Sequence, residues 1–426
     1  MLLYHLVLVT CLSLVSSELS KLDTVYEWNY IDFAWDSPPE REKAVKNESY
    51  DFTRILPVDV DVYRDGRVFV TMIGMHGVPA TLGIVTDVKG PSGPLIKPYP
   101  DWSWFKENDC DSIRNVHRIA IDKCDRLWVL DTGSREVDKS DCPAQLLTFD
   151  LRTDKLIQRL KIPNHIARNK QGDTLLVTPI VETNGEKCED TIVYMADQLG
   201  EGLVIWNGVR IYRLDSPIFQ HEPSAQRITV GNHSIDYSGG IAAMAISPRL
   251  FHEEPRLLYF HALASYTIYA TNSQILKRST FGDTIRFTGA ENILSSQAVA
   301  QAFSSNGTLF VGMTREMSIC CWNRYRSPKL KNIITIAQDN ETLQYTSGLK
   351  IIQPSERNPE EELWLLTNKF VEFQLGKLDV DRVNFRVLKK SVRELVDGTR
   401  CDLPPGTRMA LEQHNSLIES RLIVTN

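Results

Sequence analysis

The stretch AIDKCDRLWVLDTG, residues 120–133, has the pattern of a strand, a tight turn and a second strand. Apolar residues alternate before the turn and charged residues fill it. A continuous apolar run then precedes Asp131, Thr132 and Gly133. This order is typical of a β-hairpin. The sequence repeats the pattern along its length, and a repeat indicates the architecture more strongly than one hairpin does.

Six segments share this pattern, a polar or small turn followed by an aromatic or aliphatic strand. They are DVYRDGRVFVTMI (61–73), IDKCDRLWVLDTG (121–133), EDTIVYMADQLGEG (189–202), ISPRLFHEEPRLLYFHAL (246–263), FSSNGTLFVGM (303–313) and IQPSERNPEEELWLLTN (352–368). Their aromatic anchors recur at intervals of roughly 50 to 65 residues, enough for a four-stranded blade. The anchors are Phe69, Trp128, Tyr194, Tyr259, Phe310 and Trp364.

The repeat predicts an all-β chain folded as a six-bladed β-propeller. The early segment EWNYIDFAW (27–35) is free to pair with the last blade near residues 370–388. Such an N-terminal strand would close the ring and remove exposed sheet edges. A pair of β-sandwich domains is the alternative fold, and it requires a linker near the middle of the chain. No stretch there is rich enough in Pro, Gly or Ser to be one.

The N-terminus predicts export. A mostly apolar run from Leu2 to Val15 contains no Asp, Glu, Lys or Arg and is followed by small residues, as in a secretory signal. It is shorter than the about 20 residues that a membrane span needs. We expect cleavage after Ser17, so that residues 1–17 are a signal peptide and 18–426 form a single secreted, extracellular propeller domain. A buried N-terminal helix stays open as the alternative, because the run lacks a flanking Lys or Arg.

Glycosylation and disulfides are expected in an exported chain. Four Asn-x-Ser/Thr triplets are candidate glycosylation sites, and we expect two or three to be used: Asn47, Asn232, Asn306 and Asn340. Loss of Cys11 with the signal leaves an odd number of cysteines, so at least one thiol is free or pairs between chains. We expect one or two bridges within the group Cys110, Cys124, Cys142 and Cys188. A further bridge should join Cys320 or Cys321 to Cys401.

Charge argues against two classes of partner. The net charge is −6, the pI is near 5.9, and acidic and basic residues are interspersed. Nucleic acids and anionic membranes are recognised by clustered basic residues, which this chain lacks. We therefore expect neither as a partner.

Several motifs carry a resemblance to a known family. They include WNYIDFAW, PVDVD (57–61), GVPATLGIV (77–85), GPLIKPYPDWSW (93–104), YMADQLGEGLVIW (194–206), ETLQYTSGLKI (341–351) and LWLLTNKF (363–370). With these the chain resembles the insect yellow and major royal jelly protein family over nearly its whole mature length. The resemblance implies a secreted six-bladed propeller. Family members are associated with melanin chemistry and cuticle pigmentation, dopachrome conversion, amine binding in saliva, and nutritive or signalling roles, so it implies no single function.

Motif searches exclude most catalytic chemistry. The histidines show neither His-x-His nor His-x-x-x-His spacing, so we expect no metal, and no nucleotide or nucleophile motif indicates a cofactor. Any catalysis would be metal-free proton transfer, as in dopachrome isomerisation. His117, Asp131 and His261 are the candidate catalytic residues. A structural histidine and an Asx-type turn at Asp131 are the competing interpretations.

The binding candidates come from strand ends and from the resemblance. Asp131 and Asp197 each follow a repeat anchor by three residues, and we expect them at the channel mouth unless they form turns. Thr346, Asn368 and Phe370 match the family region that lines the ligand cavity of amine-binding members. The first hypothesis is a secreted protein that binds a small aromatic amine or catechol in its central channel, in a melanin, cuticle pigmentation or related role. A dopachrome-converting isomerase and a structural or signalling glycoprotein without ligand are the alternatives.

Overall fold

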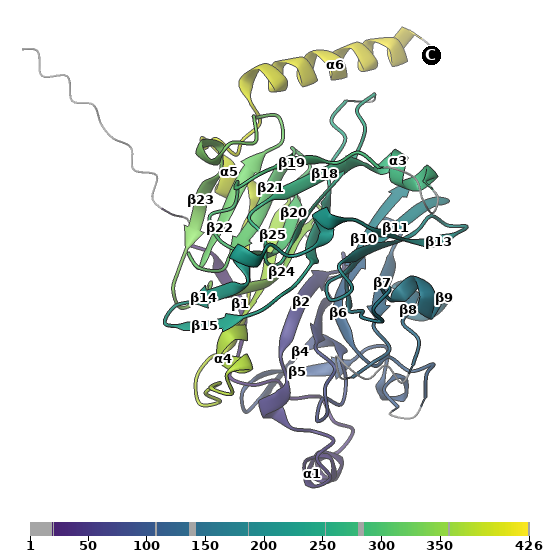
Figure 1. Cartoon of the computed structure of the whole chain (residues 1–426), viewed down its shortest axis with the longest axis vertical. Helices are drawn as coiled ribbons and strands as arrows, with labels where there is room; N and C mark the ends of the chain where they lie inside the picture. Colours follow the sequence, from purple (N-terminus) through teal and green to yellow (C-terminus); the bar gives the residue numbers. More distant parts are fainter. Residues whose placement is uncertain are drawn as a thin grey trace, which may run out of the picture.

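Six four-stranded antiparallel sheets surround one axis in the computed structural model (Figure 1), which confirms the predicted six-bladed β-propeller. The structure describes residue 19 and residues 21–106, 109–135, 142–185, 187–251, 253–279, 285–356 and 358–424, with side chains as far as residue 414. The predicted signal peptide lies outside these residues and stays a prediction.

The first three blades follow one another along the chain. Blade I contains β2 (Pro57–Val62), β3 (Val68–Met72), β4 (Leu82–Gly90) and β5 (Gly93–Pro98). Blade II contains β6 (Val116–Ile121), β7 (Arg126–Asp131), β8 (Gln145–Asp150) and β9 (Lys155–Lys161). Blade III contains β10 (Leu176–Asn184), β11 (Asp190–Asp197), β12 (Gly202–Trp206) and β13 (Ile211–Asp215).

The last three blades include one strand from the N-terminus. Blade IV contains β16 (Ile241–Ile246), β17 (Leu257–Ala262), β18 (Ile268–Asn272) and β19 (Thr288–Ala290). Blade V contains β20 (Ala298–Phe303), β21 (Thr308–Met313), β22 (Ser318–Asn323) and β23 (Ile334–Gln338). Blade VI contains β24 (Tyr345–Ile352), β25 (Glu362–Asn368), β26 (Phe385–Ser391) and β1 (Asp23–Trp28).

Short elements decorate the ring. A separate hairpin, β14 (Arg227–Val230) and β15 (His233–Asp236), lies between blades III and IV in the sequence and contacts helix α4 (Phe370–Gln374). The other helices are α1 (Pro38–Lys46), α2 (Asn164–Ala167), α3 (Ser273–Arg278), α5 (Val392–Val396) and α6 (Pro405–Val424). Helix α6 extends along one edge of the molecule, away from the blades (Figure 1). Within the described residues there are five 3-10 turns: Phe52–Arg54, Trp102–Trp104, Pro217–Phe219, Pro223–Ala225 and Leu330–Asn332.

The repeat anchors pack between neighbouring blades. All six lie on the second strand of a blade, and each is largely buried. Phe69 of blade I, for example, shares a core cluster with Leu127 and Phe149 of blade II. An aromatic residue on a pleated strand fills the space between two sheet faces, which are about 10 Å apart. The repeated aromatic positions in the sequence therefore mark residues that pack between neighbouring blades.

An N-terminal strand closes the ring as predicted, but this strand is β1 (Asp23–Trp28), which shares only Glu27 and Trp28 with the predicted segment 27–35. It pairs antiparallel with β26, with Trp28 opposite Phe385, so blade VI combines the two ends of the propeller. Trp28 is buried, and its indole Nε1 donates to the carbonyl oxygen of Pro94 in blade I at 2.7 Å. One residue thus links the closing strand to the first blade.

Three disulfides agree with the predicted pairing groups. Cys110 bonds Cys142, Cys124 bonds Cys188, and Cys321 bonds Cys401. Cys320 is a free, buried thiol, the unpaired cysteine that the odd count predicted. Disulfides are typical of oxidising compartments, so these bridges are consistent with an extracellular protein.

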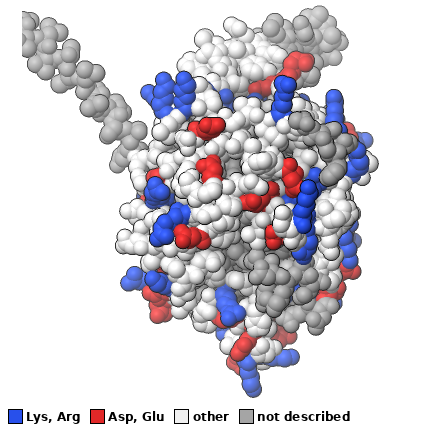
Figure 2. Space-filling model, viewed as in Figure 1, with Lys and Arg blue, Asp and Glu red and all other residues white. Residues whose placement is uncertain are grey.

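The surface carries mixed charge. Figure 2 shows Lys and Arg interspersed with Asp and Glu over the face in view. The four candidate glycosylation residues, Asn47, Asn232, Asn306 and Asn340, are all exposed, so a glycan could be attached at each without unfolding. Their use stays a prediction. Among the described residues, no helix is both long and apolar enough to cross a bilayer.

Candidate functional site

The axial channel is lined by the innermost strand of each blade. These strands, β2, β6, β10, β16, β20 and β24, contact one another in sequence, and β24 contacts β2 to complete the circle. Each strand runs from one end of the channel to the other. Residues near the strand starts therefore line one compartment and residues near the strand ends line another.

Arg118 of β6 separates the two compartments. Its guanidinium donates to the carbonyl oxygens of Ser347, at 2.8 Å from Nη2, of Val299 at 3.2 Å and of Ala242 at 3.4 Å. It also donates to Thr178 Oγ1 at 2.7 Å, and Nε donates to Ser347 at 3.1 Å. All five N–H groups of the arginine are used. The side chain joins blade II to blades III, IV, V and VI and blocks the channel between its ends.

The compartment at the strand starts, here called the His117 cavity, is small and aromatic. Its volume is about 60 Å³. The side chains that give it its character are His117, Gln198, Tyr237, Tyr345 and Phe370. Tyr345 and Phe370 stack with ring centroids 4.7 Å apart, and Tyr237 meets Phe370 edge to face at 5.8 Å. Phe370 begins α4 and Tyr237 follows β15, so these two elements cover this end of the channel.

The His117 cavity presents a neutral imidazole. Burial, together with the adjacent Arg118 charge, lowers the pKa of His117 to about 3. Its Nε2 is buried and has no hydrogen-bond partner within the protein. Burial also raises the pKa of Tyr237 and of Tyr345. At neutral pH the cavity therefore combines aromatic faces with an uncharged imidazole, and no carboxylate lines it.

Asp131 and Asp197 lie inside their own blades. Asp131 is buried and accepts from the backbone N–H groups of Asn115 and Gly133 at 2.9 and 3.0 Å. Asp197 forms a buried ion pair with Arg213 at 2.7 Å. Burial raises the pKa of both carboxyls. The Asx-type turn at Asp131 is the interpretation that fits these contacts, because the two acids end second strands whereas the channel is lined by first strands.

The other predicted residues surround the cavity to different extents. His117 and Phe370, predicted separately, both line it. Asn368 is behind Phe370: its Oδ1 accepts from the Phe370 N–H at 3.0 Å, and its Nδ2 donates to Pro57 at 2.8 Å. Asn368 therefore positions Phe370. Whether any of these residues contacts a ligand stays a prediction.

Thr346 and His261 are buried polar residues beside the channel. Thr346 Oγ1 and His261 Nε2 have no hydrogen-bond partner within the protein, and neither residue is among those that line the His117 cavity. Burial lowers the pKa of His261 to about 4. Its Nδ1 lies 3.1 Å from the carbonyl oxygen of Ala262. Both side chains are uncharged at neutral pH.

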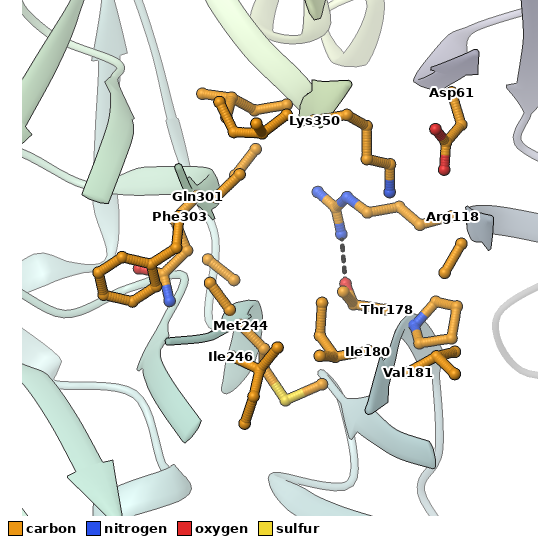
Figure 3. A pocket seen from close by; sticks show the side chains of 18 of the residues that line it. Asp61, Arg118, Thr178, Ile180, Val181, Met244, Ile246, Gln301, Phe303 and Lys350 are labelled. Atoms are coloured by element: carbon orange, nitrogen blue, oxygen red, sulfur yellow. Dashed lines mark hydrogen bonds between the residues drawn. The ribbon is translucent and has the colours of Figure 1, made fainter. Parts of the chain in front are cut away.

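The second compartment contains charged residues that sequence reasoning missed. This Lys350 pocket lies at the strand ends and has a volume of about 230 Å³ (Figure 3). Asp61, Arg118 and Lys350 line it together with aliphatic side chains. Lys350 pairs with Asp59 at 3.0 Å and donates to the carbonyl oxygen of Ile119 at 2.7 Å. The sequence feature that could have identified these residues is a charged side chain within an otherwise apolar strand. Asp61 in PVDVDV and Arg118 in VHRIAI are examples.

Metal ligation has no candidate in the part of the chain that is described. No group of three or more His, Cys, Asp and Glu side chains is arranged there to hold an ion.

The fold and the channel define a class of protein, a six-bladed β-propeller with a divided axial channel. A model of the major royal jelly protein family matches residues 114–401, more than half of the chain. Major royal jelly protein 9 of Apis mellifera is 37% identical over 388 residues, covering 89% of this chain and 90% of that protein. Major royal jelly protein 1 of the same species is 35% identical and covers 91% of each chain. The chain belongs to the major royal jelly protein family.

Solved structures show more distant likenesses. An α-L-arabinofuranosidase from Fusarium graminearum is 10% identical, covers 88% of this chain and all of that chain, and has a TM-score of 0.48. A virginiamycin B lyase from Staphylococcus aureus is 9% identical, covers 80% of this chain and 96% of that chain, and has a TM-score of 0.40. We draw nothing about activity from likenesses this weak.

Proposed function

We propose that this protein is an extracellular propeller that binds a small hydroxylated aromatic molecule, a catechol or a ring-hydroxylated amine, in the His117 cavity. A pigment-related role would follow from that ligand class. The observation that carries the proposal is the unpaired Nε2 of His117, which belongs to a cavity walled by Tyr237, Tyr345 and Phe370. A buried polar atom without a partner is rare, and a ligand hydroxyl would supply one.

The cavity chemistry favours the ring hydroxyls over an ammonium group as the recognised feature. An ammonium ion out of water requires a carboxylate, and no carboxylate lines this compartment. The Arg118 cation borders it instead. A neutral catechol can stack on Phe370 and hydrogen-bond to His117 without bringing an unpaired charge into the channel.

Entry of the ligand requires the cover to move. A cavity of about 60 Å³ is smaller than the about 150 Å³ that encloses one benzene ring. The stack of Tyr345 and Phe370 must therefore open, with α4 moving from the β14–β15 hairpin. Phe370 would exchange a contact with Tyr345 for a similar contact with the ligand ring, so the cost of opening is partly offset.

The pKa values of the two channel histidines support ligand binding without catalysis. A general base works best when its pKa is near the working pH. His117 and His261, with pKa values of about 3 and about 4, are weak bases at neutral pH. Loss of dopachrome colour faster than in buffer alone, and slower with His117→Phe, would establish the isomerase alternative instead.

Calorimetry with three matched probes tests the proposal. Dopamine has both the catechol and the amine, 4-methylcatechol lacks the amine, and phenethylamine lacks the hydroxyls. We expect 4-methylcatechol to bind most tightly and dopamine more weakly, because the dopamine ammonium has no carboxylate partner in this compartment. Phenethylamine should bind about tenfold more weakly than dopamine, because one satisfied buried polar group is worth roughly 1–3 kcal/mol. Phenethylamine binding as tightly as dopamine would contradict the proposal, and so would the absence of binding by all three.

Two variants and one control variant locate the site. Phe370→Ala should weaken catechol binding, whereas Phe373→Ala, on the same helix but outside the cavity lining, should leave it unchanged. His117→Phe keeps the ring and removes the nitrogens, so it should abolish the preference for hydroxylated probes.

A further inference from the structure

The Lys350 pocket is divided into a polar side and an apolar side. In Figure 3 the charged ends of Lys350 and Asp61 lie on one side of the opening and the Arg118 guanidinium projects into it. Met244 and Ile246 lie across from Lys350 and Asp61, with Gln301 above them. Blades I, II and VI supply the polar side, and blades III, IV and V supply most of the apolar side. An occupant that matches this division has one small polar head and an apolar body.

Hydrogen-bonding capacity remains on the polar side. Lys350 Nζ has three donors and uses two, on Asp59 and on the Ile119 carbonyl oxygen. The Asp61 carboxylate accepts one backbone N–H on each oxygen, from Val62 at 2.9 Å and from Ile121 at 3.0 Å. It retains lone pairs for another donor. Arg118 has no donor left. The polar side thus offers one N–H donor and one carboxylate acceptor, and Gln301 Oε1, which also belongs to a lining residue, is a further buried acceptor without a partner in the protein.

The charges around the pocket balance at neutral pH. Arg118 and Lys350 are matched by Asp59 and Asp61. An ion entering this pocket would add an unpaired charge, which is costly away from water. A hydroxyl group adds no charge and can both accept from Lys350 and donate to Asp61, so it uses the donor and the acceptor of the polar side at once.

The volume of the Lys350 pocket and its opening to the surface fit a small molecule with one ring. A volume of about 230 Å³ exceeds the about 150 Å³ that encloses benzene, which leaves room for a substituent. Rim side chains such as Ile180, Ile246 and Ile351 are partly exposed, so the pocket reaches the surface at the strand ends. Entry here requires no opening of blades.

We propose that the Lys350 pocket binds a small neutral alcohol with an apolar body, with the hydroxyl held between Lys350 Nζ and the Asp61 carboxylate and the body packed against Met244 and Ile246. This site is on the opposite side of Arg118 from the His117 cavity. It is therefore independent of the function proposed above.

Four probes that share a cyclohexane ring test which polar group the pocket recognises. Cyclohexylmethanol carries the hydroxyl, cyclohexanecarboxylate an anion, cyclohexylmethylammonium a cation and methylcyclohexane no polar group. Titration calorimetry or saturation-transfer NMR on the secreted full chain at pH 7.5 compares them. We expect cyclohexylmethanol to bind about tenfold more tightly than each of the others. An ionic probe that binds as tightly, equal binding of methylcyclohexane, or no binding by any probe would overturn the proposal.

Substitutions assign the binding to this pocket. Ile246→Trp fills the apolar side at a partly exposed position and should abolish binding of cyclohexylmethanol. Ile157→Trp, the same change at an exposed residue of β9, should leave it unchanged, and so should Phe370→Ala in the other compartment. Equal melting temperatures of the two tryptophan variants would establish that Ile246→Trp is folded. Undiminished binding to a folded Ile246→Trp protein would overturn the proposal.

Discussion

At the scale of single residues, the channel depends on charged side chains within buried strands. Arg118 donates to four blades, through the carbonyl oxygens of Ala242, Val299 and Ser347 and the hydroxyl of Thr178. Burial lowers the pKa of Arg118, and nearby Asp59 opposes that effect. The residue is therefore an internal tie between blades, and its removal would leave buried acceptors unpaired.

Replacing Arg118 with lysine tests this tie. Lysine keeps the charge but has three donors on one atom, so it cannot reach blades III to VI together. We expect Arg118→Lys to lower the free energy of unfolding by about 3 kcal/mol in urea titrations with the disulfides intact. Arg227→Lys is the control, because Arg227 and Asp236 form an exposed pair that contributes about 0–1 kcal/mol. Equal stability of the two variants would show that the tie is dispensable.

Asp61 should make stability depend on pH. Burial, only partly opposed by Lys350, raises the pKa of Asp61 from 3.8 to about 6. Between these values the folded protein holds a proton that the unfolded chain has lost, so this contribution to stability is complete below about pH 4 and disappears as the pH rises through about 6. The full effect is about 3 kcal/mol.

Asp61→Asn removes this titration. The free energy of unfolding of the original protein minus that of the variant should fall between about pH 4 and 7 and then level off. Urea titrations at a series of pH values measure the difference. A difference that is constant, or that rises with pH, would contradict the assigned pKa shift.

At the scale of elements, strand β1 completes the ring of blades. β1 covers the edge of β26, which would expose unpaired backbone groups without it. Trp28 holds this strand in place in two ways. Its side chain is buried in the hydrophobic cluster that includes residues of blades I and VI, and its indole donates a hydrogen bond to the carbonyl oxygen of Pro94. The closure thus depends on one large side chain.

Truncation of that side chain tests the closure. Trp28→Ala should lower the free energy of unfolding by about 3–5 kcal/mol, because it leaves a cavity between blades VI and I. Thr24→Ala, on the same strand but exposed, should change it by less than about 0.5 kcal/mol. Thermal unfolding of both variants followed by circular dichroism measures the contrast. Similar melting curves for the two would mean that β1 does not depend on Trp28.

At the scale of the whole molecule, disulfides connect segments that are distant in sequence. The Cys321–Cys401 bridge spans 80 residues and joins blade V to the segment after α5. Closing a loop this long removes entropy from the unfolded chain. Cys320, next to it in sequence, stays reduced because it is itself buried and no second thiol remains among the described cysteines.

A thiol count on secreted protein tests both the pairing and the predicted signal cleavage. Burial raises the pKa of Cys320, so we expect almost no reaction with a thiol reagent in the native protein. In denaturant, without reductant, one thiol per chain should react. Two reactive thiols would mean that Cys11 is retained, and rapid labelling of the native protein would mean that Cys320 is accessible.

The sequence alone determined the repeat, the blade number, the closure by an N-terminal strand and the groups of pairing cysteines, because each follows from local alternation or from spacing. The bounds of the closing strand differ from the prediction, since β1 ends where most of the predicted segment begins. Tertiary structure decided which polar residues meet at the axis. The repeat marks second strands, so Asp131 and Asp197 were prominent in sequence although their carboxylates bond within their own blades. Arg118, Asp61 and Lys350 lie on first strands, and only ring closure brings those strands together around one channel.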